Sequence, residues 1–130
     1  MDILANLKQR WEGLDYPFLI HSTGELRFNE ISKQKAVDLS GVKSGDVVAV
    51  IGDFDPQSIL TLLQLIDKKV ILVPLTTDTR SQHEYFFESA LVDVMIEGDL
   101  VQHIEHDKSH ELIKQLRSKE HAGLVLFSTG

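Results

Sequence analysis

The hydrophobic pattern predicts a sheet whose strands are covered on both faces. Four apolar runs of strand length occur in the chain, with little of the polar alternation expected of a strand that has one face in water. They span residues 47–51, 70–73, 92–96 and 124–127. Stretches long enough for a crossover helix separate the runs, which favours parallel pairing through right-handed connections. The predicted fold class is therefore α/β, a three-layer, mainly parallel sheet with flanking helices over residues 45–130.

Helix signals occur between the apolar runs. The clearest is Asp55-Pro56, because an aspartate is a good N-cap and proline is tolerated at the first helical position. Two further helices are predicted over residues 80–90 and 109–119. For the last of these we expect Asp107 or Ser109 as the cap.

The N-terminal part is predicted to contain a helix, a hairpin and a second helix. Apolar residues with helical spacing mark an amphipathic helix within residues 1–15, and the simplest interpretation is that it packs on its own domain; they are Leu4, Leu7, Trp11 and Leu14. Residues 17–28 are predicted to form a β-hairpin that turns at Ser22-Thr23-Gly24. A helix over residues 30–40 would begin after Asn29 and end at Gly41. Residues 1–130 are thus interpreted as a single α/β domain.

Composition excludes several classes of function. The chain has 130 residues, a net charge of −7 and no cysteine. The acidic balance disfavours nucleic acid and anionic membranes as partners, because both require basic surface. Without cysteine there can be no disulfide, thiolate metal site or cysteine nucleophile. The first residues show no signal-peptide pattern, so we expect a cytoplasmic location.

The last apolar run leads directly into Ser128-Thr129-Gly130. In parallel sheets ligands bind beyond the carboxyl ends of the strands, and hydroxyl and glycine residues there can surround an anion. We interpret these three residues as the beginning of a phosphate-binding loop whose remainder is missing. The same tripeptide in the predicted hairpin turn shows that its context, not its letters, carries the signal.

Four segments together resemble the N-terminal part of the AMP-forming, adenylate-forming synthetases, the family of acyl-CoA synthetases and luciferases. Their order and spacing agree with that family from about residue 10 onward. The segments are Leu26-Arg-Phe-Asn-Glu-Ile31, Gly41-Val-Lys-Ser-Gly-Asp-Val-Val48, the stretch 62–75 that ends in Val-Pro-Leu, and Leu126-Phe-Ser-Thr-Gly130. One departure is Lys68-Lys69, where the family has Ala-Gly; a lysine in the left-handed position after a helix would cost about 1 kcal/mol.

The resemblance implies a carboxylic acid ligase. The parent enzyme would use ATP and Mg²⁺ to form an acyl-adenylate from a small-molecule carboxylate, with coenzyme A as the expected acceptor. Ser128, Thr129 and Gly130 would begin its phosphate loop, whereas the catalytic residues would lie in the remainder of the enzyme. The isolated chain is expected to be inactive and to bind no cofactor. A truncated face would also favour homo-oligomers, with Trp11 or residues 124–127 near the contact.

Other interpretations remain open beside this one. His103, His106 and His110 would share one face of a helix and could hold zinc, although a solvated loop leading into a helix explains them more simply. Asp53 and Asp55 could be a phospho-receiver site, but the residues expected after the later strands are absent. The alternative function is a free-standing, non-catalytic α/β interaction or scaffold domain.

Overall fold

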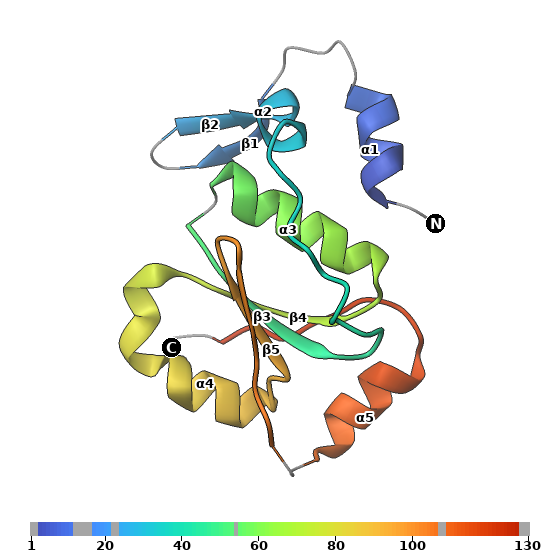
Figure 1. The fold of residues 1–130 in the computed structure, drawn as a ribbon, viewed down its shortest axis with the longest axis vertical. Helices are drawn as coiled ribbons and strands as arrows, with labels where there is room; N and C mark the ends of the chain where they lie inside the picture. Colours follow the sequence, from blue (N-terminus) through green and yellow to red (C-terminus); the bar gives the residue numbers. More distant parts are fainter. Residues whose placement is uncertain (1–2, 12–16, 22–23, 54, 107–108, 128–130) are drawn as a thin grey trace.

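The computed structural model describes residues 3–11, 17–21, 24–53, 55–106 and 109–127, and these form three layers (Figure 1). Helix α3 (Pro56–Asp67) covers one face of a mainly parallel sheet, and α4 (His83–Ala90) and α5 (Glu111–Ser118) lie on the other. Successive residues of β3 (Val47–Ile51) are buried against opposite layers, Val48 and Val50 on the α3 side. Two-sided burial explains the continuous apolar runs and confirms the predicted fold class.

The sheet order in the described part of the chain is β6-β5-β3-β4-β7. Strands β3, β4 and β5 correspond to three of the predicted runs, and β3 pairs in parallel with both of its neighbours. Strand β4 pairs in parallel with β7, whereas β5 and β6 pair antiparallel. The bounds of the other strands are Ile71–Leu75 for β4, Val94–Glu97 for β5, Leu100–His103 for β6 and Gly123–Leu124 for β7.

Strand β7 is shorter than the predicted run 124–127 because of Pro74. The Val125 amide donates to the Leu72 carbonyl at 2.8 Å, so the β4 groups that face β7 belong to residues 72 and 74. The next ladder bond would need an N–H group on Pro74, and proline has none. The strand therefore ends at Leu124, and the Val125 carbonyl has no donor to meet on β4.

The predicted helix over residues 30–40 is wrong beyond its first turn. Helix α2 is Phe28–Ser32, and the chain from 33 to 40 is irregular. Val37 and Leu39 are buried there while the residues between and around them are exposed. Burial with a period of two requires extended backbone, and packing of these two side chains into the α3 layer outweighs the helix signals.

The N-terminal elements cover the outer side of α3. Strands β1 (Pro17–His21) and β2 (Gly24–Arg27) pair antiparallel, and α1 spans Ile3–Trp11. Leu4, Leu7 and Trp11 of α1 pack against a cluster from α2 and α3 that includes Phe28 and Leu60. The apolar face of α1 thus packs on its own domain, as the sequence predicts. No helix among the described residues is both long enough and apolar enough to cross a bilayer.

The helices after Asp55 lie where the sequence predicts them, but their caps and first turns differ in part from the prediction. The Asp55 carboxylate accepts from the Ser58 amide at 3.1 Å, which confirms it as the cap of α3. The predicted helix over 80–90 begins as a 3-10 helix, η1 (Thr77–Gln82), before α4. The expected cap of α5 is wrong: the His110 ring accepts from the Leu112 amide at 3.0 Å.

Lys69 occupies the left-handed position after α3, with φ of 61°. Replacing it with glycine is expected to raise the free energy of unfolding by about 1 kcal/mol, because glycine lacks the Cβ that this conformation crowds. Lys68 carries the same charge but has φ of −84°, so Lys68→Gly should be destabilising. Urea unfolding of both variants checks the prediction, and equal changes in the same direction would contradict it.

Candidate functional site at the carboxyl edge of the sheet

Strand β7 directs the chain toward the carboxyl edge of the sheet. Because it is parallel to β4, the residues that follow it lie beside the end of β4. Leu126 lines a hollow of about 330 Å³ together with Gly52, Pro74 and Thr76. Phe127 stacks on Phe86 of α4 at a centroid distance of 4.2 Å. The predicted phosphate-loop residues Ser128, Thr129 and Gly130 lie outside the described residues.

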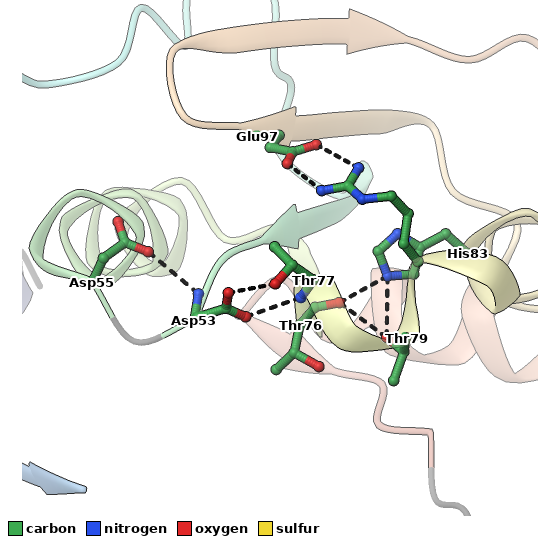
Figure 2. Close-up of polar contacts among 8 residues, drawn as sticks. Asp53, Asp55, Thr76, Thr77, Thr79, His83 and Glu97 are labelled. Carbon is green, nitrogen blue, oxygen red and sulfur yellow. Dashed lines mark hydrogen bonds and ion pairs between the residues drawn. The ribbon is translucent and has the colours of Figure 1, made fainter. Parts of the chain in front are cut away.

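At this edge Asp53 bridges the ends of β3 and β4 (Figure 2). Its carboxylate accepts from the Thr77 amide at 2.9 Å and also from the Thr77 hydroxyl. Thr77 opens η1, so the carboxylate occupies the place where an anion would meet the first free N–H groups of this turn. Asp53 therefore fixes the loop after β4 and is already satisfied within the chain.

The contact with Thr77 predicts a pH dependence. Hydrogen bonds from the Thr77 hydroxyl and then from its amide hold the pKa of Asp53 below its ordinary value of 3.8. The stabilisation is thus fully present above pH 3.8 and is lost as the pH falls through the lowered pKa. The Thr77 amide resonance should titrate with a midpoint below 3.8, and Asp53→Asn should abolish the transition. A midpoint at or above 3.8 would show that the contact is absent in solution.

Arg80 and Glu97 form a second bridge across the edge. Two guanidinium nitrogens lie 3.1 Å and 2.6 Å from the two Glu97 carboxylate oxygens. This hydrogen bonding holds the pKa of Glu97 below its ordinary range and raises the pKa of Arg80. Since both side chains have exposed surface, the pair fixes geometry more than it stabilises the fold. It joins η1 to the end of β5.

His83, at the start of α4, is buried and only 5% exposed. Its Nε2 atom is 3.0 Å from the Thr76 carbonyl oxygen, which can only accept, so Nε2 carries the proton and donates. The same atom is 3.1 Å from the Thr79 hydroxyl oxygen. The His83 ring thus contacts both Thr76 and Thr79 and holds this part of the loop in place. The sequence alone does not point to His83, because a single histidine in a helical segment has no spacing signal.

The remaining carboxylate and histidine candidates have structural partners. Asp55 caps α3, and Asp53 is occupied by Thr77, an arrangement that does not support a phospho-receiver site. The shared helical face expected for the three histidines is wrong: His103 lies in β6, His106 is 2.7 Å from Asp93, and His110 caps α5. In the part of the chain that the structure describes, no group of three such residues is arranged to hold a metal ion.

The polar side chains described at the carboxyl edge are held in hydrogen bonds with one another, which leaves few of them available for a reaction. Asp53, Arg80, His83 and Glu97 each have a partner within the chain. Beside them lies the apolar hollow, whose described lining residues carry hydroxyl groups at Ser58 and Thr76. Hydrogen bonds tie the ends of β3 and β5 to η1, so this edge could support a neighbouring loop.

The comparisons with known proteins bear on the fold. Neither the comparison with protein families nor that with curated proteins gave a match. Among solved structures, the chain is similar to the N-terminal subdomain of NpsA from Klebsiella oxytoca, with a TM-score of 0.56 and 18% sequence identity. The similarity covers 92% of this chain and 32% of that one, so the chain spans about a third of its length. At this identity the similarity shows a shared fold.

Proposed function

We propose that this chain is the N-terminal part of an AMP-forming carboxylic acid ligase of the acyl-CoA synthetase type. The fold neighbour is a subdomain of an adenylate-forming enzyme, and the similarity extends over 92% of the chain. Three of the segments that resemble the family lie along the parallel strands. One leads into β3, one runs from the second half of α3 through β4 with Pro74, and one follows β7 at the carboxyl edge.

The observation that carries the proposal is the direction of β7. A strand parallel to β4 brings Leu126 to the hollow at the carboxyl edge, beside Thr76. Ligands of α/β sheets bind at this edge, and Ser128, Thr129 and Gly130 are the next residues in the sequence after Phe127. We propose that their hydroxyl and N–H groups bind phosphate oxygens of ATP.

The rest of the chemistry is assigned to the remainder of the parent enzyme. When bound, Mg²⁺ would neutralise charge on the leaving pyrophosphate. The described residues would hold the phosphate loop in place: Asp53 and His83 fix the end of β4, and Phe86 anchors Phe127. Which carboxylic acid is activated depends on a pocket outside this chain, and coenzyme A is the proposed acceptor.

A second candidate is the non-catalytic interaction domain. It is favoured by one observation, that the polar groups of the described edge are paired with one another. The experiment that separates the two is incubation of the full-length protein with Mg-ATP and a panel of carboxylic acids. The ligase should release pyrophosphate and form acyl-AMP, detected by mass spectrometry, with at least one acid. Absence of acyl-AMP with every acid would favour the interaction domain.

A further inference from the structure

An apolar groove with an acidic rim lies between α4 and the segment after β6, away from the carboxyl edge. Its volume is about 390 Å³. We call it the acidic groove, and the residues that matter for its chemistry are Glu84, Phe87, Glu88, Leu91, Ile104 and Glu105.

The groove is formed by fixed elements. Positions 84, 87 and 88 follow helical spacing, so α4 presents them on one face, and Leu91 follows the last residue of the helix. The floor is apolar: Leu91 is 9% exposed, and Phe87 and Ile104 are partly buried. The opposite wall is held because the Ile104 amide donates to the Asp93 carbonyl at 2.8 Å. A partner would therefore meet a preformed surface.

The exposed charged side chains at the rim of the groove are all negative. Glu84, Glu88 and Glu105 are exposed, and none of them has an ion pair within the described residues. The neighbouring imidazole of His106 is engaged by Asp93 at 2.7 Å. The whole chain has a net charge of −7, so no distant excess of positive charge offsets the rim.

We propose that the acidic groove binds a basic amphipathic helix of a partner protein. Apolar side chains on one face of such a helix would cover Phe87 and Ile104, and lysine or arginine side chains beside that face would meet the three glutamates. An acidic helix would be repelled by the rim, and so would an anionic membrane. This docking function is independent of ligase activity.

The test uses a synthetic helical peptide of about 16 residues, long enough to form a helix, with leucines on one face and lysines on the other. A matched peptide carries glutamate in place of each lysine. Binding is measured by fluorescence anisotropy, and the contact surface is mapped by amide NMR shifts. The lysine peptide should bind, with shifts centred on Phe87, Glu88 and Ile104, and the affinity should fall as salt increases.

Charge reversal supplies the control. Glu88→Lys and, separately, Glu84→Lys should each weaken binding about tenfold, whereas Glu25→Lys should change it by less than about twofold. Glu25 lies on β2, at the opposite end of the molecule from α4 (Figure 1), and its substitution alters net charge equally. Melting curves confirm that each variant is folded. No saturable binding, equal binding of the glutamate peptide, an equal loss in the Glu25 variant, or shifts outside the groove would overturn the proposal.

Discussion

Gly52→Ala is expected to lower the free energy of unfolding by about 2–3 kcal/mol, the upper part of the range for overpacking a well-packed site. A Cβ atom on residue 52 would lie 2.4 Å from the Ser58 Cβ and 2.7 Å from its hydroxyl oxygen. Both atoms are held in the first turn of α3, where Ser58 bonds to the Asp55 cap. The turn from β3 into α3 would have to shift. Urea unfolding measures the change.

The clash can be isolated with a second substitution. Ser58→Gly removes the Cβ that meets residue 52, at the cost of a weaker first turn. In the double variant Gly52→Ala/Ser58→Gly the two losses should therefore be less than additive, because the close contact no longer exists. Strict additivity would show that Gly52 is needed for another reason.

Asp93→Ala is the second large effect, with an expected loss of about 2–3 kcal/mol from an unsatisfied buried donor and a lost charged hydrogen bond. The Asp93 carboxylate accepts from the Val47 amide at 2.8 Å and lies 2.7 Å from the His106 ring. Val47 is fully buried at the start of β3, so its N–H group would have no replacement partner. Urea unfolding measures this loss as well.

Asp93→Asn is the matched control. The asparagine carbonyl oxygen can still accept from the Val47 amide, while the charge that His106 and Arg117 face is removed. We expect this variant to lose about 1 kcal/mol, much less than alanine. If asparagine were as damaging as alanine, the charge and not the amide contact would be the main contribution.

The sequence predicts the central layer of this fold well because burial on both faces leaves a continuous apolar run. That signal placed β3, β4 and β5, and the Asp55-Pro56 pair gave the start of α3. The apolar-run signal does not predict β6, because Leu100 is 54% exposed and most of its neighbours in the strand are polar. An edge strand paired on one side only needs little apolar surface, and Gly98 with φ of 63° supplies the turn.

The site was harder to predict than the fold because its contacts join distant positions. Asp53 and Thr77 are 24 residues apart in the sequence, and Arg80 and Glu97 are 17 residues apart. No spacing rule links such pairs until the strand order is known. The early end of β7 likewise depends on Pro74, which sits in a neighbouring strand. What the sequence did indicate was the edge at which these residues meet.

The most direct test of the central claim compares the two Ser-Thr-Gly segments in one assay. Carboxylate-dependent exchange of pyrophosphate into ATP is measured for the full-length protein and for two double variants. Ser128→Ala/Thr129→Val should reduce the exchange rate about 100-fold, as expected for loss of donors to a developing charge. Ser22→Ala/Thr23→Val, the same change in the other Ser-Thr-Gly segment, should leave the rate nearly unchanged. Equal rates for the two variants, or no exchange in the unaltered protein, would contradict the account.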